Sequence, residues 1–270
     1  MSESELRVPC WTPSLSRTIA ILAAALIAPG CSATTIFEDD FSGSALGPAW
    51  TAIDRQGDTG VDEQGCYQPA QVAVGGGNLV LHSIVQTTSC GDQFNPPTTF
   101  PYATGMVQWT SFSFTYGTVH FRAQMAGGRG TWSAVWMLGA SCRAASLASG
   151  ANIGCPWPAP GSEEIDITEI KNSDLTTVWQ NLISTARGTL SCTPTTGDVS
   201  QGFHDYELVW APGSLDWKID GAETCRYTGT IPSSPMFLMV DTALGGGAGP
   251  VDPSTLPQTL LVDYVKITQP

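Results

Sequence analysis

Short runs of alternating apolar and polar residues dominate the sequence after residue 33, and this pattern limits the fold more than any other feature. Neighbouring side chains on a β-strand point to opposite faces, so a strand with one buried face has a period of two. Gly, Pro, Asn and Asp separate the runs, which occupy residues 78–83, 117–124, 206–210, 215–219, 236–240 and 260–267. No long stretch has the period of an amphipathic helix. The sequence therefore predicts an all-β protein built as a sandwich or a barrel.

The composition supports a large core and argues against a nucleic-acid partner. The chain has 270 residues, of which 42% are hydrophobic and 13% are charged. An all-β fold of this length is often one domain, and no internal repeat or low-complexity linker divides the sequence. A formal net charge of −13 repels phosphate backbones and anionic lipids. The nine tryptophans are many for this length, so we expect some of them to line a ligand-binding surface.

Residues 1–33 are predicted to be an export signal. Basic residues precede an apolar run at 19–28, which is too short to span a bilayer comfortably. Small residues follow, and the sequence around Ala33 fits cleavage after that residue. In the alternative interpretation Cys31 is lipidated and anchors the protein to a membrane. The expected location is therefore extracellular or periplasmic, with residues 34–270 as the mature chain and the lipid anchor as the alternative.

The cysteines agree with export. Of eight cysteines, Cys10 and Cys31 fall in the predicted signal, which leaves six. Six cysteines permit fifteen pairings. No two of them have the C-x₂-C spacing of a zinc site, so disulfides in an oxidising compartment fit better. Their order along the chain favours three local pairs: Cys66–Cys90, Cys142–Cys155 and Cys192–Cys225.

The segment SEEIDITEI, residues 162–170, carries four carboxylates among β-branched residues, which favour a strand. On a regular strand Glu164 and Asp166 share one face, and Glu169 points away. A β-bulge at Ile167-Thr168 absorbs one residue and turns Glu169 to the face of the other two acids. The sequence therefore predicts a bulged strand that presents three acids together.

Such a bulge predicts a catalytic separation. With one residue absorbed, Glu164 and Glu169 are about four strand steps apart, roughly 13 Å at about 3.3 Å per step. If each side chain leans along the strand by roughly 4 Å, the carboxyl groups are about 5 Å apart, which is the separation in retaining glycosidases. Repulsion keeps one acid protonated near neutral pH while its neighbour stays ionised and attacks. A calcium site or a solvated acidic edge strand would explain the same residues without catalysis.

The residues 164–169 match the E-x-D-x-x-E signature of glycoside hydrolase family 16, in the longer form of its β-1,3-glucanases and red-algal galactanases. Two further blocks are similar to that family. Residues 130–138 resemble its G-x-W-P-A-x-W-M-L block, with Ser133 in place of Pro, and residues 203–210 resemble its F-H-x-Y-x-x-x-W block. The resemblance spans about residues 36–268 in the expected order.

This resemblance implies an all-β jelly-roll sandwich of two curved antiparallel sheets with a concave substrate cleft, formed by residues 34–270 as a single catalytic domain. It implies that Glu164 is the nucleophile, Asp166 its helper and Glu169 the acid/base of a retaining, double-displacement hydrolysis that needs no cofactor. The implied protein is a monomeric endo-β-1,3-glucanase of laminarinase type that acts on polysaccharide. Alternatives on the same scaffold are a β-1,3-1,4-glucanase, a galactanase or a transglycosylase. A lectin-like module that binds glycan without cutting it is a further alternative, against which the acid trio argues.

The resemblance also suggests which residues bind the sugar chain. Trp132 and Trp136 lie four positions apart, so they share a strand face and offer indole platforms for sugar rings. Trp157 is expected to close one end of the cleft. The strand after the catalytic one lacks the His that is usual in β-1,3-glucanases, and Gln180 or Asn181 is expected to replace its hydrogen bonds.

Three further features belong to this comparison. Arg122 is expected either to orient substrate or to pin a neighbouring strand. Asp241 stands where Asn is common, which leaves the preferred sugar chain open. A structural calcium ion is a further expectation, with oxygen ligands from Asp263, the backbone of Gly77 and an acid near Asp40.

Overall fold

The computed structural model describes residues 33–145, 154–171 and 173–270. The predicted signal up to residue 32, with Cys31, lies outside the described residues. The helices of the described part are 3-10 turns of three residues each, and none has the length and hydrophobicity needed to cross a bilayer. They are η1 (Thr59–Val61), η2 (Pro69–Gln71), η3 (Ala140–Cys142), η4 (Gly246–Ala248) and η5 (Pro253–Thr255).

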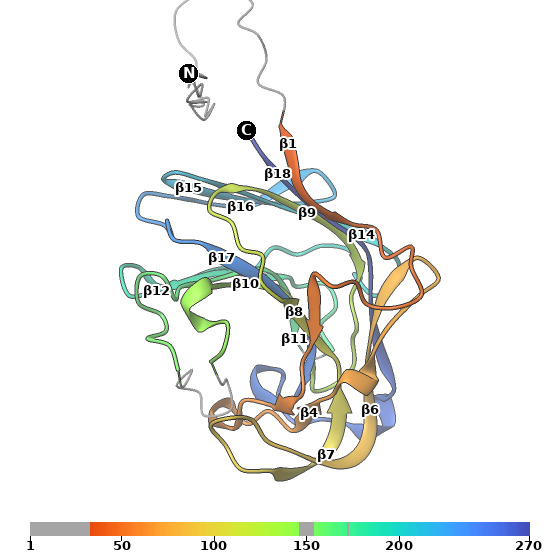
Figure 1. The fold of residues 1–270 in the computed structure, drawn as a ribbon. Coiled ribbons are helices and arrows are strands. Elements are labelled where there is room, and N and C mark those ends of the chain that lie inside the picture. Colours follow the sequence, from red (N-terminus) through yellow and green to blue (C-terminus); the bar gives the residue numbers. More distant parts are fainter. Residues whose placement is uncertain (1–32, 146–153, 172) are drawn as a thin grey trace, which may run out of the picture.

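The strands form two sheets that lie against each other as layers. Figure 1 shows the larger sheet curving from β15 and β16 round to β6 and β7, with β10, β12 and β17 of the smaller sheet in the second layer. The larger sheet has the order β16 (Ala222–Thr228), β15 (Ser214–Ile219), β14 (His204–Ala211), β9 (Gly117–Gln124), β18 (Gln258–Gln269), β6 (Asn78–Cys90), β7 (Thr98–Thr104), β4 (Gly65–Tyr67), β3 (Arg55–Gln56), with β1 (Thr34–Asp39) on β18 and β5 (Val72–Gly75) on β6.

The smaller sheet is the one that positions the site. Its order is β13 (Gly188–Cys192), β12 (Trp179–Ser184), β11 (Glu164–Lys171), β10 (Thr131–Gly139), β17 (Met236–Leu244), β8 (Met106–Trp109), β2 (Trp50–Ala52). The all-β sandwich predicted from the sequence is therefore confirmed. One pair departs from the antiparallel rule, because β4 runs parallel to β7.

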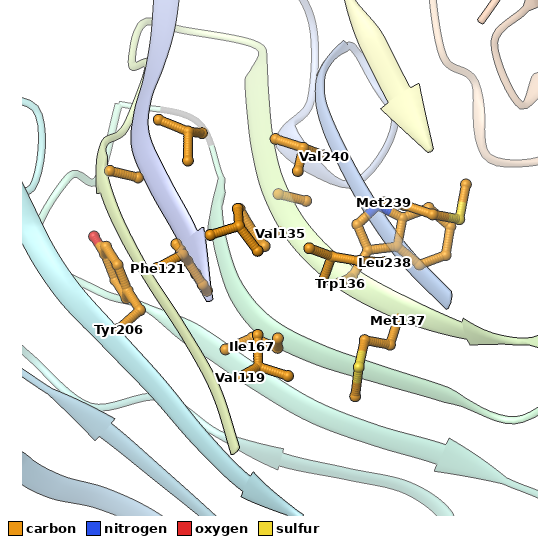
Figure 2. Close-up of a cluster of buried hydrophobic side chains, with 14 of the residues drawn as sticks. Val119, Phe121, Val135, Trp136, Met137, Ile167, Tyr206, Leu238, Met239 and Val240 are labelled. Carbon is orange, nitrogen blue, oxygen red and sulfur yellow. The ribbon is translucent and has the colours of Figure 1, made fainter. Parts of the chain in front are cut away.

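Alternation along the strands builds the core between the two sheets. On β9 the residues Val119, Phe121 and Ala123 are buried, whereas those between them are partly exposed. On β11 the buried Ile165 and Ile167 belong to the same core. Figure 2 shows part of this cluster, with labelled side chains from β9, β10, β11, β14 and β17. Truncating such a fully buried Ile to Ala costs about 2–5 kcal/mol of stability. The packing of these isoleucines therefore fixes the position of β11, whose opposite face carries the acids.

All three predicted disulfides are present. Cys66–Cys90 joins β4 to the end of β6, and Cys142–Cys155 links η3 to the segment that precedes β11. Cys192–Cys225 joins β13 of the smaller sheet to β16 of the larger one. The last bridge therefore ties together the edge strands of the two layers.

Candidate active site

The bulge predicted from the acid spacing is present on β11. Against β12, Asp166 pairs with Asn181 and Glu169 pairs with Trp179, and the register shifts between these pairs. Against β10, the register shifts between the pairs Val135–Thr168 and Trp136–Asp166. Ile167 is therefore the extra residue of the bulge and has no paired residue on β10. The extra residue turns Glu169 away from the core.

A pocket of about 400 Å³ lies on the face of the smaller sheet that points away from the core. The three acids Glu164, Asp166 and Glu169 line it together. Its wall includes side chains of β10, β12, β13 and β17, while the segment 58–63 and Tyr67 on β4 contribute from the larger sheet's side. The volume is in the range of small-ligand sites. The predicted carboxyl separation of about 5 Å stays a prediction.

Each acid is held by hydrogen-bond donors. The Trp157 indole donates to Glu164 Oε2 at 2.9 Å. Asn181 Nδ2 donates to Asp166 Oδ2 at 2.8 Å and to Glu169 Oε2 at 2.6 Å. The Trp132 indole donates to Glu169 Oε1 at 2.6 Å. Glu169 therefore has more partners that stabilise its anionic form than Glu164 has.

Burial raises the pKa of all three acids. Burial and then the charge of Glu169 raise the pKa of Glu164 to about 7, and hydrogen bonds from Trp157 and Asp166 oppose this. Burial and the two neighbouring carboxylates raise the pKa of Asp166 well above its usual value. Burial also raises the pKa of Glu169, against the opposing effects of the Lys171 ammonium and the Trp132 indole. The shared burial of the trio therefore favours the retention of a proton, and Asp166 contributes a hydrogen bond to Glu164.

The geometry of a bulged strand with three facing acids agrees with a family comparison. A model described as Glycosyl hydrolases family 16 matches residues 81–266. The chain belongs to glycosyl hydrolases family 16.

Individual proteins are similar to the chain over most or part of its length. A beta-glucanase of Rhodothermus marinus is 32% identical in an alignment that covers 57% of this chain and 58% of that protein. The chain thus spans little more than half the length of that relative. A glucan endo-1,3-beta-glucosidase of Cryptopygus antarcticus is 26% identical in an alignment that covers 85% of this chain and 90% of that protein.

A solved structure shares the fold. The catalytic domain of an endo-1,3-beta-glucanase (laminarinase) from Thermotoga petrophila RKU-1 superimposes with a TM-score of 0.75 at 22% identity. The superposition covers 88% of this chain and 98% of that domain.

The tryptophans that the family 16 resemblance assigned to the cleft all line the pocket. Trp132 and Trp136 lie on β10 on the same side of the strand, and Trp157 stands beside Glu164. Trp136 is only 9% exposed, and its indole donates to Asp241 at 2.7 Å. Each indole N–H is thus bonded to an acid of the pocket, which fixes the ring planes beside the acids.

The choice between Gln180 and Asn181 is settled by strand alternation. Asn181 faces the pocket, where it bridges two acids. Gln180 points to the other side of β12, where its carbonyl oxygen accepts a hydrogen bond from Thr224 on β16. The prediction that Gln180 binds substrate is therefore wrong, because adjacent strand residues face opposite ways.

Arg122 also lies elsewhere. It projects outward from β9 of the larger sheet, where its Nη1 donates to Asp263 Oδ2 at 2.7 Å and its guanidinium stacks on Phe203. Arg122 therefore pins β9 to β18, and the prediction that it orients substrate is wrong. The physical reason is that Val119, Phe121 and Ala123 occupy the core-facing positions of β9 and leave Arg122 on the outer side.

The same ion pair bears on the predicted calcium site. One Asp263 oxygen is taken by Arg122, and Asp40 accepts a hydrogen bond from the backbone of Ser42. Within the described ranges no group of three or more His, Cys, Asp or Glu side chains is arranged to hold a metal. Calcium binding by Asp263, the backbone of Gly77 and an acid near Asp40 therefore stays a prediction.

Sequence reasoning missed several pocket residues. Lys171 and Trp179 lie on β11 and β12 beside Glu169. Lys171 follows Glu169 by two positions, so strand alternation was a signal that could have found it. Asp241 enters from β17, and Glu63 and Tyr67 enter from the other side of the pocket. Nothing in the local sequence places these three next to the acidic strand.

Proposed function

We propose that the protein is a retaining endo-β-1,3-glucanase that hydrolyses laminarin-type polysaccharide by double displacement. The observation that carries the proposal is the bulge of β11, which brings Glu164, Asp166 and Glu169 into one pocket. Membership of family 16 and the likeness to a glucan endo-1,3-beta-glucosidase over 85% of the chain support it. The name of the similar beta-glucanase leaves the linkage open, so β-1,3-1,4-glucan is the alternative substrate.

The first step forms a covalent glycosyl-enzyme. A carboxylate oxygen of Glu164 attacks the anomeric carbon while the bond to the leaving oxygen breaks, and Glu169 gives that oxygen its proton. Asp166, which donates a hydrogen bond to Glu164, steadies the attacking carboxylate. Trp157 holds the other side of the same carboxylate.

The second step releases the sugar with its original configuration. Glu169, now ionised, takes a proton from water, and the resulting hydroxide oxygen attacks the anomeric carbon and frees Glu164. The partners of Glu169 on β10, β11 and β12 stabilise its anion in this half of the reaction. Interception of the intermediate by a sugar hydroxyl instead of water gives the transglycosylation alternative.

The export and domain predictions belong to the same proposal. Three disulfides support an oxidising compartment, and hence an extracellular or periplasmic protein. β1 pairs with β18, so the two ends of the range 34–270 meet in one sheet, which supports a single catalytic domain. Monomeric action on polysaccharide is proposed on the same basis, because one chain supplies every residue named in the site.

One set of assays tests the function. Laminarin, lichenan, agarose and carrageenan are digested side by side, the products are identified, and the anomer that forms first is followed by NMR. We expect oligosaccharides from laminarin with the β-anomer first, and no turnover by Glu164→Gln, which keeps the fold. Initial release of the α-anomer, or full activity of Glu164→Gln, would refute the mechanism. Cleavage of lichenan alone would shift the substrate to mixed-linkage glucan.

A further inference from the structure

Lys171 has an unusual place in the pocket. Its ammonium nitrogen lies 4.7 Å from the ring centroid of Trp132 and 4.7 Å from that of Trp179, within the range of cation–π attraction. The same nitrogen lies 3.3 Å from Glu169 Oε2. Among the described residues that line the pocket, Lys171 is the only Lys or Arg. Two rings and a carboxylate thus hold one cation beside the acid/base of the proposed reaction.

The position follows from the bulge. After the extra residue at Ile167-Thr168, Glu169 and Lys171 are alternate residues on the same face of β11. Their side chains are 7% and 21% exposed, so solvent screens the pair weakly. Trp132 and Trp179 come from β10 and β12, the two strands that flank β11. The ammonium is therefore fixed by both neighbouring strands.

We propose that Lys171 is a positioning residue that sets the charge and orientation of Glu169 during catalysis, which rests on the proposed function of Glu169 as the acid/base. It does not touch the bond that breaks. It offsets the negative charge on Glu169 after that group has given up its proton, and so favours the ionised form that activates water. The same contact disfavours the protonated form that begins the cycle.

The other acids near Glu169 act in the opposite sense to Lys171 when they are ionised. Glu164 and Asp166 face it from its own strand, and Asp241 lies across Ala134 on β17. Glu63 and Asp58 also line the pocket, and the charge of Glu63 raises the pKa of Asp241. The groups from β10 and β12, Trp132 and Asn181, donate neutral hydrogen bonds.

The position of Lys171 as the one Lys or Arg among the described pocket-lining residues has a definite consequence. Without Lys171, Glu169 keeps its proton to higher pH, because an opposite charge at this distance lowers a carboxyl pKa by about 1–3. The alkaline limb of kcat/KM, which reports the protonated acid of the free enzyme, then moves to higher pH. At pH values above neutral the loss of Lys171 favours the first step and slows the second.

The direct test needs no substrate. The protein is labelled with ¹³C at the Glu side-chain carboxyl carbons, and the Glu169 signal is assigned by its absence from Glu169→Gln and titrated by NMR. In Lys171→Met we expect the midpoint to rise by about one pH unit or more. Lys171→Arg, which keeps the charge, should stay close to the wild type. Lys171→Gln takes the place of the Met variant if that variant does not fold.

A second cation serves as the matched control. Lys218 pairs with Glu207 on the larger sheet and is not in the pocket, so Lys218→Met removes one Lys–Glu pair without touching Glu169. It should leave both the Glu169 midpoint and the pH profile unchanged. An unchanged Glu169 midpoint in Lys171→Met, or one that moves equally in Lys218→Met, overturns the proposal.

Kinetics then separate this proposal from the proposed function. On laminarin, the alkaline limb of kcat/KM should move upward in Lys171→Met in parallel with the NMR midpoint. If the midpoint moves and the limb does not, Lys171 has no role in the reaction and the proposal fails. If wild-type protein cleaves none of the four polysaccharides, the proposed function fails instead, and the NMR result alone shows whether Lys171 controls the charge of Glu169.

Discussion

The Trp136 indole donates a 2.7 Å hydrogen bond to the buried carboxyl group of Asp241, and both residues line the pocket. Burial raises the pKa of Asp241 to about 8, and the charges of Glu63 and Glu169 contribute, against the opposing effect of the Trp136 bond. Near neutral pH Asp241 is therefore a neutral carboxylic acid. It offers a hydroxyl donor and a carbonyl acceptor, so the amide of Asn is its uncharged analogue of similar shape.

The first prediction concerns stability against pH in Asp241→Asn. A carboxyl whose pKa is about 8 when folded, against an ordinary value of 3.8, binds a proton more tightly in the folded state. Its contribution to the free energy of unfolding is complete below about 3.8 and is lost as pH rises toward 8. The amide of the variant cannot titrate. At pH 8 the free energy of unfolding of Asp241→Asn should therefore be at least about 1 kcal/mol higher than that of the wild type, which raises Tm by about 2–4 °C.

Thermal melts of both proteins from pH 5 to pH 8 check this prediction. The difference in Tm, variant minus wild type, should grow as pH rises. Asp54→Asn, the same substitution at an exposed Asp that does not line the pocket, is the control against which this growth is compared. A constant difference for Asp241→Asn would show that the carboxyl is already ionised at neutral pH.

The second prediction separates two neighbouring amides on β12. Asn181→Ala removes the donor that bridges Asp166 and Glu169, so the two carboxyl groups repel without a shared partner. Hydrogen bonds to charged groups contribute about 1.5–3 kcal/mol, so kcat/KM should fall by about 10- to 100-fold. Gln180→Ala should lower Tm through the lost contact with Thr224 and keep kcat/KM within about twofold of the wild type. Equal losses of kcat/KM in both variants would contradict the assignment of faces.

Gln180 and Asn181 also show which parts of the site the sequence predicts and which it does not. Spacing alone predicts the bulge, because no regular strand turns Glu164, Asp166 and Glu169 to one face. Which of Gln180 and Asn181 faces the pocket depends on the register of β12 against the bulged strand, where Asp166 pairs with Asn181. Registers across a loop are set by three-dimensional packing and are not visible in a local pattern.

Long-range partners were beyond prediction for a similar reason. The alternation around Arg122 predicts a strand, but its partner Asp263 lies 141 positions away in the sequence, so nothing local showed which sheet the strand would join. Asp241 and Glu63 reach the pocket from other strands and loops. The three tryptophans predicted for the cleft do line the pocket, since they lie on the strand that pairs with β11 or just before β11, and their contact with sugar stays a prediction.

The third prediction concerns the disulfide next to the pocket. Cys142–Cys155 spans 13 positions and ends two residues before Trp157, the residue that bonds Glu164. Replacing both cysteines by Ser should cost about 2–3 kcal/mol of stability through the freed chain entropy. It should also reduce kcat/KM, because Trp157 is held less firmly.

The bridge Cys192–Cys225 provides the comparison, since it joins two edge strands and closes a longer loop. Its removal should lower Tm at least as much and reduce kcat/KM less. The measurements are Tm by circular dichroism and kcat/KM on laminarin at a temperature where all variants are folded. If the variant without Cys192–Cys225 loses more kcat/KM than the variant without Cys142–Cys155, the Cys142–Cys155 bridge does not support activity by holding Trp157 in place.

The last prediction tests the roles of the two glutamates directly. Glu169→Ala removes the acid/base, so hydrolysis of laminarin, whose leaving group needs a proton, should fall by about 100-fold or more. An activated aryl β-glycoside has a leaving group that departs without a proton, so it should still form the glycosyl-enzyme on Glu164. Azide, which needs no base, then attacks from the face that water uses, and the product is a β-glycosyl azide. Its configuration is read by NMR, and an α-product would mean that azide displaced the aglycone in one step without Glu164. Glu164→Gln is the matched variant: it should give neither hydrolysis nor β-azide, because no covalent intermediate forms.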